Sequence, residues 1–233
     1  MDINNIFAIG YKCTADEFIK VFLKIRKYSS PFSYMVIDIN TALDFIKNGF
    51  ENYTNNDYIK PGSYNYKFNN RAWGCSHIHT CSVLTNEYVD ILDMDKVCLW
   101  NHHDLYDKNV VGALNKRADH LLHCINNKSD TTLLFYIEKI QEYGMKDNYF
   151  DKSILDGYNC NFLILIPLLN FNRDPVLFFD NSQIRIIYFN SNIEGWTTDT
   201  DRDIEEWDKL AMFVNTLYNF NIENRDCENF NIL

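Results

Sequence analysis

Five short, predominantly apolar runs constrain the fold of this 233-residue chain more than any other feature. Runs of four to eight such residues are typical of strands. A strand without polar alternation indicates a parallel sheet that is buried on both faces. The first run ends at a glycine, Gly10, as a buried strand that enters a turn would. The five runs lie at 6–9, 97–100, 132–137, 162–169 and 184–189.

Apolar residues recur at helical spacing between these runs. Thr14 and Glu17 form a capping box that predicts the start of the first helix. Because strands and helices alternate, we expect an α/β fold, with a mostly parallel or mixed sheet flanked by helices. We expect one domain over residues 1–233, with a loop-rich excursion at about 51–95 in which residues 51–70 could form a weak hairpin; an α+β arrangement is the alternative. The predicted helices cover 14–27, 40–50, 110–125, 149–155 and 201–218.

Composition narrows the classes of partner. The chain has 22 Lys and Arg against 32 Asp and Glu, a net charge of −10, which argues against a sequence-independent nucleic-acid binder. We find no apolar window of the length a membrane span needs and no basic, apolar leader, so we expect no membrane partner and a cytoplasmic location. The seven scattered Cys residues then favour free thiols over a disulfide framework.

Cys13 is the first candidate for chemistry. It follows the first predicted strand and precedes the first predicted helix. A thiol at a helix N-terminus faces unsatisfied backbone N–H groups and the positive end of the helix dipole, and both favour the nucleophilic thiolate. A buried structural cysteine is the alternative interpretation.

His102, His103 and Asp104 form the second candidate, because they follow the apolar run 97–100. An imidazole there could act as the general base of a cysteine nucleophile. Neighbours on a strand point to opposite faces, so only one of the two His residues can face the site of Cys13. Asp104 can orient the ring of His103 only if the backbone turns between them. A polar strand end in solvent is the alternative.

A metal or cofactor site is not expected. Cys75, His77, His79 and Cys81 alternate, but on a strand they would spread over roughly 20 Å, too far for one tetrahedral centre. At most, His77 and His79 could act as a pair of ligands. The chain has no glycine-rich phosphate motif and no Gly-x-Ser-x-Gly. The remaining candidates lie at helical spacing, where we interpret them as partly buried structural residues: His120, His123 and Cys124.

The order of several motifs resembles a family of papain-like cysteine peptidases found in bacteria and large DNA viruses. Its pattern is a Leu-Gly strand end followed by Cys, a Pro-Phe-Asp-Trp segment, a His-Asp-Phe segment and an Arg-Arg helix ahead of a strand. The resemblance covers roughly residues 5 to 137. The matching segments here are Ile9-Gly10 with Cys13, Ser30 to Tyr34, His103 to Leu105, Lys116-Arg117 and Leu133 to Tyr136.

The resemblance implies site residues and also shows departures. Cys13 matches the family's Cys, and His103 with Asp104 matches its His-Asp. Pro31, Phe32 and Arg117 match the Pro-Phe and the second Arg. The departures are Ser33 and Tyr34 in place of Asp and Trp, Lys116 in place of the first Arg, and Glu138 where the strand often ends in Arg.

Three functions follow as hypotheses. The first is a cysteine hydrolase for a protein or peptide substrate, in which Cys13 attacks an acyl carbon and His103 takes the proton. Asp104, or an acid not yet identified, would orient the imidazole. The second is a non-catalytic interaction protein, viral or host-directed, on the same fold. The third is a sugar or nucleotide transferase, for which the sequence offers no phosphate-binding loop.

Overall fold

A mixed β-sheet forms the centre of the protein. The computed structural model describes residues 1–10, 14–25, 29–33, 35–55, 57, 59–68, 71–79, 98–100, 105–138, 140–145, 148–191 and 201–220. Four strands pair in parallel in the order β11-β9-β7-β2, β10 adds an antiparallel edge next to β11, and β8 pairs with β9. The strands are β2 (Asn5–Gly10), β7 (Thr132–Ile137), β8 (Gln141–Glu142), β9 (Asn161–Leu169), β10 (Val176–Asp180) and β11 (Ile184–Asn190).

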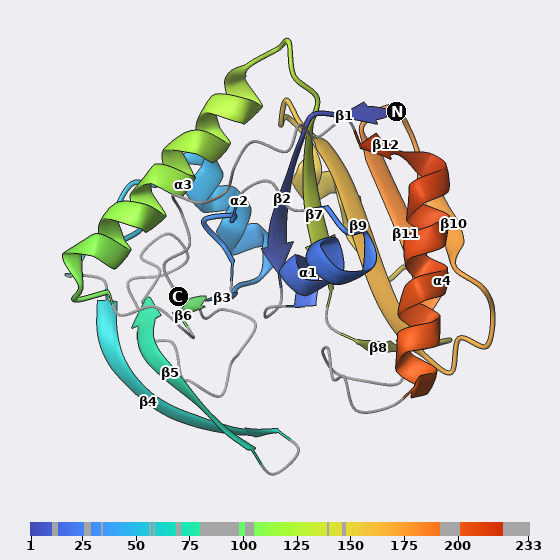
Figure 1. Cartoon of the computed structure of the whole chain (residues 1–233), viewed down its shortest axis with the longest axis horizontal. Coiled ribbons are helices and arrows are strands. Elements are labelled where there is room, and N and C mark those ends of the chain that lie inside the picture. Colours follow the sequence, from blue (N-terminus) through green and yellow to red (C-terminus); the bar gives the residue numbers. More distant parts are fainter. Residues whose placement is uncertain are drawn as a thin grey trace.

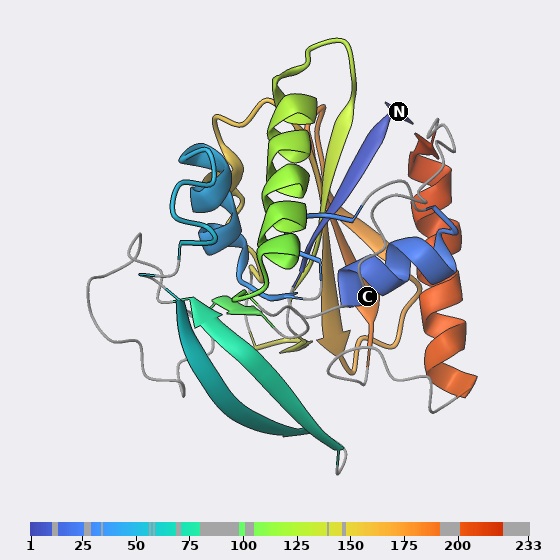
Figure 2. The same ribbon diagram turned by 60° about the vertical axis from the view of Figure 1, so that its left-hand side comes forward.

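Helices cover both faces of this sheet, as Figure 2 shows. Helices α2 (Ile39–Lys47) and α3 (Lys108–Asn126) lie on one face. Helix α1 (Thr14–Glu17), its continuation η1 (Phe18–Phe22) and helix α4 (Asp201–Leu217) lie on the other. The predicted α/β class, with a mixed sheet flanked by helices, is therefore confirmed.

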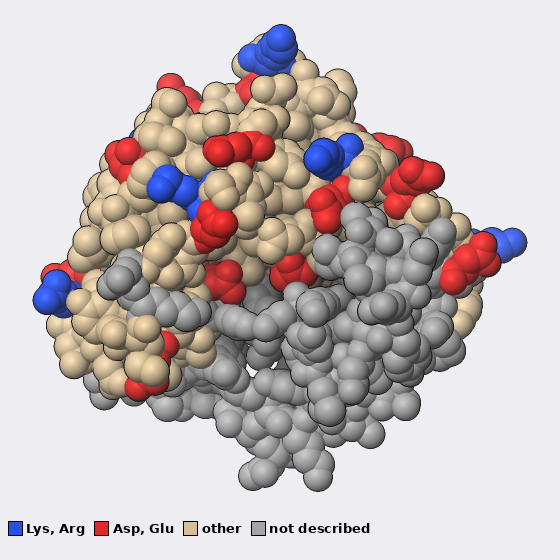
Figure 3. All heavy atoms as spheres, turned by 180° about the vertical axis from the view of Figure 1, so that it is seen from behind, with Lys and Arg blue, Asp and Glu red and all other residues tan. Residues whose placement is uncertain are grey.

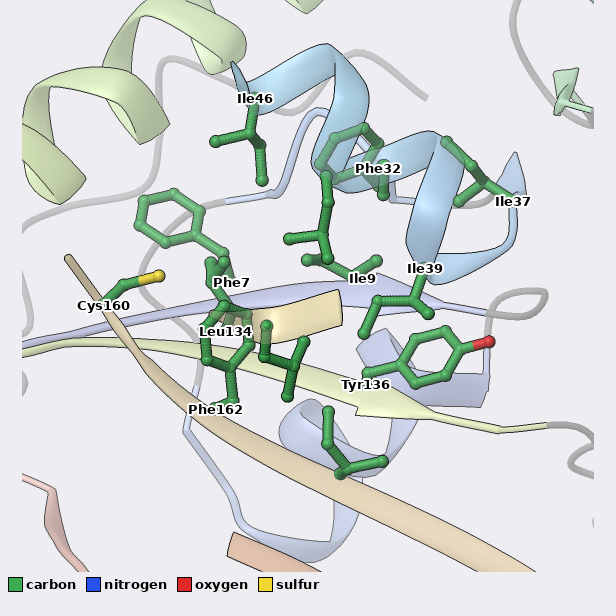
Figure 4. Close-up of a cluster of buried hydrophobic side chains, with 14 of the residues drawn as sticks. Phe7, Ile9, Phe32, Ile37, Ile39, Ile46, Leu134, Tyr136, Cys160 and Phe162 are labelled. Carbon is green, nitrogen blue, oxygen red and sulfur yellow. The ribbon is translucent and has the colours of Figure 1, made fainter. Parts of the chain in front are cut away.

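Each of the four parallel strands buries alternate residues in two separate cores, which explains why their apolar runs are continuous. Phe7 and Ile9 of β2 pack in one core, together with α2 and α3 (Figure 4). Ile6 and Ala8 pack in the other, together with α1, η1 and α4. Burial on both faces therefore favours apolar residues along the whole strand.

Aromatic rings fill the core beneath α4. The rings of Phe18 and Phe135 stack at 5.5 Å with an interplanar angle of 9°. Trp207 contacts Phe18 and Phe189 at centroid distances of 5.4 and 5.2 Å. This cluster fixes the helix that begins at Thr14 against the sheet, and it does so close to the segment that carries Cys13.

The first helix is shorter than its apolar spacing predicts. It begins at Thr14, changes to a π-helical turn over Phe18–Phe22, and is capped by Leu23. Lys24 then takes a positive φ of 55°, a conformation that stops a right-handed helix. The predicted continuation to residue 27 is therefore wrong. Because Thr14 is already helical, Cys13 stands at the position before the helix.

The run at 97–100 does not join the central sheet. Its described part, β6 (Cys98–Trp100), belongs to a second, four-stranded sheet in the order β3-β6-β5-β4. All pairings there are antiparallel. Periodicity identifies a strand but not its partner, so the sequence could not show which sheet it enters. The other strands of this sheet are β3 (Met35–Val36), β4 (Ile59–Phe68) and β5 (Arg71–His79).

The region expected to be a loop-rich excursion or a weak hairpin contains a hairpin, whose register shifts between Pro61 and Tyr64. Strands β4 and β5 pair over most of their length and extend away from the central sheet (Figure 1). Strand β5 also pairs with β6, from His77 opposite Trp100 to His79 opposite Cys98. The hairpin thus connects to the rest of the second sheet through one end of β5.

The remaining boundaries differ by a few residues. The predicted helix at 40–50 ends at Lys47, since Gly49 and Phe50 adopt positive φ. The short helix predicted at 149–155 is a single 3₁₀ turn, η4 (Lys152–Leu155). Strands β1 (Asp2–Ile3) and β12 (Asn219–Phe220) pair in parallel and were not predicted. None of the helices in the described residues has the length and apolarity to cross a membrane.

A core substitution should show how strongly the fold depends on the central sheet. Leu134 is fully buried in β7 between β2 and β9. We expect Leu134→Ala to lower the free energy of unfolding by about 2–5 kcal/mol, because it leaves a cavity. Met145→Ala, at a side chain with 71% exposure, should change it by less than about 0.5 kcal/mol. Urea denaturation measures both; equal effects would contradict the assignment of this core.

Candidate active site at the carboxyl edge of the sheet

The carboxyl ends of the parallel strands meet at one edge of the central sheet. Strands β2 and β7 end there side by side, with Gly10 opposite Ile137. Functional groups of open α/β sheets gather at such an edge. Helix α1 begins four residues after Gly10, and Glu138 follows β7. The strand that precedes Cys13 in the chain therefore ends at this edge.

The predicted catalytic residues themselves lie outside the described residues. This holds for Cys13 and for His102, His103 and Asp104. Their flanks are described, however, and can be traced. The flanks are Gly10 and Thr14 on either side of the first segment, and Trp100 and Leu105 on either side of the second.

Backbone pairing connects the two flanks through β3. The N–H of Ile37 donates to the carbonyl of Gly10 at 3.4 Å. Ile37 directly follows β3, and β3 pairs with β6 so that Met35 lies opposite Trp100. Trp100 and Gly10 each stand three residues before a predicted catalytic residue. Strand β3 and Ile37 thus lie between the strand that precedes Cys13 and the strand that precedes His103.

The turn before β3 is firmly held. Ser30 accepts a hydrogen bond from the N–H of Phe32 on its hydroxyl, at 3.2 Å, and one from the N–H of Ser33 on its carbonyl, at 3.1 Å. The buried hydroxyl of Tyr53 donates to the carbonyl of Pro31. Phe32 is 1% exposed and Ser33 is fully buried. A side chain on this turn is therefore fixed in place.

Ser33 makes a contact that links this turn to helix α1. Its hydroxyl donates to Oδ1 of Asp16 at 2.7 Å, a short, charge-assisted hydrogen bond. Asp16 is half-buried in the first turn of α1, three residues after Cys13 in the chain. The sequence did not predict that these two residues form a pair. Asp16 alone could have been noticed, because it is a carboxylate in the first turn of the helix that follows Cys13.

A second polar group at this edge comes from β7. Tyr136 is 2% exposed; its hydroxyl lies 3.4 Å from Oε2 of Glu138 and accepts from the N–H of Ile39. Figure 4 shows its ring beside Ile39, at the start of α2. Burial raises the pKa of the Tyr136 phenol well above its usual value, and the charges of Glu138 and Asp38 raise it further. The phenol is therefore neutral at physiological pH.

Asp38 is engaged in a structural role beside this group. Its Oδ1 accepts from the N–H groups of Asn40 and Thr41 at 2.9 and 3.1 Å, and its Oδ2 accepts from the Thr41 hydroxyl. It is thus the N-cap of α2 and satisfies backbone donors that the helix cannot. These contacts account for both of its oxygens.

Helix α3 holds a cysteine and a histidine in contact, but away from this edge. Sγ of Cys124 lies 3.7 Å from Nε2 of His120, one helical turn earlier. The thiol belongs to a residue that is 4% exposed, and the carbonyl of Cys124 accepts from Thr132 at the opposite, amino end of β7. A thiol so buried cannot reach an acyl carbon of a substrate, which agrees with the structural role expected from the sequence.

Arg117 is buried. Among the described charged residues that belong to the family motifs, it has the lowest exposed fraction. It is 8% exposed on the inner face of α3, whereas Lys116 is exposed. The two positions of the Lys-Arg motif therefore differ in role, and only Arg117 faces the interior.

Three of the four candidate metal ligands lie on one strand, in the region expected to be rich in loops. Cys75, His77 and His79 belong to β5, and Cys81 lies outside the described residues. Within the described residues, no cluster of three or more His, Cys, Asp or Glu side chains could hold a metal ion. On the described part of the face in Figure 3, Asp and Glu side chains are interspersed with Lys and Arg side chains. The Lys and Arg side chains on this part of the surface form no extended basic patch.

Comparison with protein families assigns the chain to a family through residues 4–151. Residues 4–151 match the family described as "putative papain-like cysteine peptidase (DUF1796)". The chain belongs to this family. The match spans β2, the turn at 30–33, β6, α3 and β7, and so includes every element that borders the candidate site. A search of curated proteins found no match, and neither did a search of solved structures.

Thiol reactivity should distinguish Cys13 from the described cysteines. Burial raises the pKa of the Cys160 thiol to about 12, and Cys124 and Cys160 are 4% and 3% exposed. Only the thiolate reacts with iodoacetamide. We therefore expect Cys13 to be labelled faster than the other six thiols at neutral pH, as mass spectrometry of tryptic peptides would measure. Labelling of Cys13 as slow as that of Cys160 would make it a structural thiol.

The buried phenol predicts a loss of stability at high pH. The pKa of Tyr136 is raised on folding. The contribution of the neutral phenol to the free energy of unfolding is therefore complete below about pH 10 and is lost as the pH rises further. Above about pH 10, we expect the free energy of unfolding of Tyr136→Phe to fall less steeply with pH than that of the wild type, by up to about 1.4 kcal/mol per pH unit. Urea denaturation at several pH values measures this slope. Tyr106→Phe, at a 58% exposed residue, is the control. An unchanged slope in Tyr136→Phe would contradict the prediction.

Proposed function

We propose that this protein is a thiol hydrolase of the papain-like peptidase type, with Cys13 as nucleophile and His103 as general base. The chain belongs to a family whose description is a papain-like cysteine peptidase, and this description supports the proposal. The observation that carries the proposal is the convergence of flanking strands, because Ile37 donates to Gly10 of β2 and the preceding strand β3 pairs with β6. Two groups that must act together need their supporting elements to meet in this way.

The reaction uses ordinary acyl-transfer steps. The Cys13 thiolate attacks the carbonyl carbon of an amide, and the C=O π electrons move to the oxygen. When the tetrahedral species collapses, the C–N bond breaks and the leaving amine takes the proton from the His103 imidazolium. Water then attacks the thioester carbon while His103 takes its proton; the C–S bond breaks, the acid leaves, and the sulfur regains the proton from His103.

The proposed mechanism also needs an acidic residue that supports His103. An acidic group beside His103 orients the imidazole and stabilises the imidazolium that forms. Asp104 is the acid that the resemblance implies. Peptides and proteins are the substrates that the family description suggests.

Two substitutions test the proposal. With a pool of fluorogenic peptidyl-aminomethylcoumarins as probe, we expect Cys13→Ala and His103→Ala each to lower hydrolysis by about 10³-fold or more. Cys124→Ala, at the buried thiol of α3, is the matched control and should retain wild-type hydrolysis per folded molecule. Circular dichroism and urea denaturation establish that the variants are folded.

Two results would contradict the proposal. The first is hydrolysis that survives in Cys13→Ala or His103→Ala at the wild-type rate. The second needs no substrate: a wild-type Cys13 that reacts with iodoacetamide with the pH dependence of an ordinary thiol, near pH 8.5, would leave no activated nucleophile. Either result would favour the non-catalytic interaction protein on the same fold.

A further inference from the structure

We propose that residues 48–53, which we call the latch, are a strained segment that holds the turn at 30–33 in place and opens without unfolding of the central sheet. The latch directly follows helix α2. None of its residues belongs to the proposed catalytic pair, so its opening can be measured without a substrate and without the proposed chemistry.

The backbone of the latch is left-handed for longer than the end of a helix needs. Gly49, at a φ of 64°, donates its N–H to the carbonyl of Ile46 at 3.2 Å. The N–H of Phe50 donates to the carbonyl of Phe45 at 2.7 Å, which completes a Schellman cap. Phe50 and Asn52 then also take positive φ, at 60° and 61°. Asparagine tolerates this conformation, whereas a bulky side chain is strained in it. The closed latch is therefore strained at Phe50.

Ring packing holds Phe50 in this conformation. Its ring contacts those of Phe32, Phe45 and Tyr53 at centroid distances of 5.5, 6.2 and 5.0 Å. Tyr53 also packs edge-on against Phe45 at 5.1 Å. A strained residue persists only where the surrounding contacts outweigh its strain. The strain thus favours the open state and the ring contacts favour the closed one.

Tyr53 connects the latch to the turn at 30–33. It is 1% exposed, and its hydroxyl donates to the carbonyl of Pro31. The same oxygen lies 3.5 Å from Sδ of Met35, the first residue of β3. Phe32, which follows Pro31, packs against the ring of Phe50. The latch, the turn and the start of β3 therefore share one buried cluster.

The turn in turn contacts the carboxyl edge of the central sheet. Ile37, which follows β3, donates its N–H to the carbonyl of Gly10 at the end of β2. Ser33, in the turn, donates its hydroxyl to Asp16 of α1. Both contacts come from the chain segment that Tyr53 holds. A closed latch fixes this side of the edge, and an open latch leaves the turn free to move.

The latch lies mostly at the surface, so it can open separately from the sheet. Asn48, Gly49 and Glu51 are exposed, and Phe50 and Asn52 are half-buried. Strands β7 and β9, by contrast, are buried along almost their whole length. Segments near the surface open at a lower free energy than the core of a domain. Local opening of the latch therefore needs no loss of strand pairing in the sheet.

Hydrogen exchange of the full chain, followed by NMR, tests for this opening. The hydrogen-bonded amides of Ser33 and Tyr53 report on the turn and on the latch, and the amides of β9 report on the sheet. We expect the protection factors of Ser33 and Tyr53 to be at least about tenfold lower than those of β9, because local opening exposes the first two amides only. Equal protection at all three places would overturn the proposal.

Two substitutions at position 50 separate strain from packing. Phe50→Ala removes the ring but keeps a Cβ at a positive φ, whereas Phe50→Gly removes both. We expect Phe50→Ala to lower protection at Ser33 and Tyr53 by about tenfold or more, because three ring contacts are lost. Protection in Phe50→Gly should be about fivefold higher than in Phe50→Ala, since glycine adopts positive φ without strain.

The order of the two variants is what identifies strain. In an unstrained loop, glycine lowers protection relative to alanine, because the open chain gains freedom. Protection in Phe50→Gly at or below that in Phe50→Ala would therefore contradict a strained latch. Phe178→Ala, at a half-exposed phenylalanine of β10, is the matched control for loss of a ring and should leave Ser33 and Tyr53 unchanged.

Tyr53→Phe tests the connection between the latch and the turn. It keeps the ring and removes the hydroxyl that donates to Pro31. We expect protection at Ser33 to fall about fivefold while the amides of β9 keep theirs. Unchanged protection at Ser33 means that the latch does not hold the turn, and this result overturns the proposal even if both Phe50 variants fail to fold.

Discussion

Parallel pairing of four strands that are buried on both faces is the constraint on which the rest of the structure depends. Parallel neighbours cannot be joined by a tight turn, so the chain must leave the sheet at each carboxyl end and return at the amino end. Here the return from β2 to β7 contains α1, the turn at 30–33, α2, the second sheet and α3. This crossover starts at the edge where β2 ends and finishes at the opposite edge, where β7 begins.

That arrangement explains why a site can form at this edge. The long crossover brings the turn at 30–33 and strand β3 back beside β2, through the hydrogen bond between Ile37 and Gly10. It also brings β6 beside β3. The core under α4 and the core under α2 pack against the two faces of the sheet and hold both sides of the edge. Stability and site geometry thus depend on the same packing, whereas the charges of Asp16, Asp38 and Glu138 lie at its rim.

The candidate site shows how one structural contact refines a motif. Sequence reasoning selected Cys13 and His103 from spacing and resemblance, and those residues remain predictions. It treated Ser33 only as a departure from the family pattern. The hydrogen bond between Ser33 and Asp16 gives that departure a physical partner. Residues 17 apart, on a helix and on a turn, could not be paired from periodicity, because neither position has a sequence signal for the other.

The sequence by itself determined the class of the fold and the main elements. Continuous apolar runs predicted β2, β7, β9 and β11, since a strand with two buried faces has no polar alternation. Helical periodicity predicted α2, α3 and α4 to within a few residues. Tertiary structure alone decided that β6 joins a second, antiparallel sheet, that the first helix stops at Phe22, and that Asp16 meets Ser33. These outcomes depend on contacts between distant segments, and local patterns of hydrophobicity carry no information about which distant segment a strand or side chain will contact.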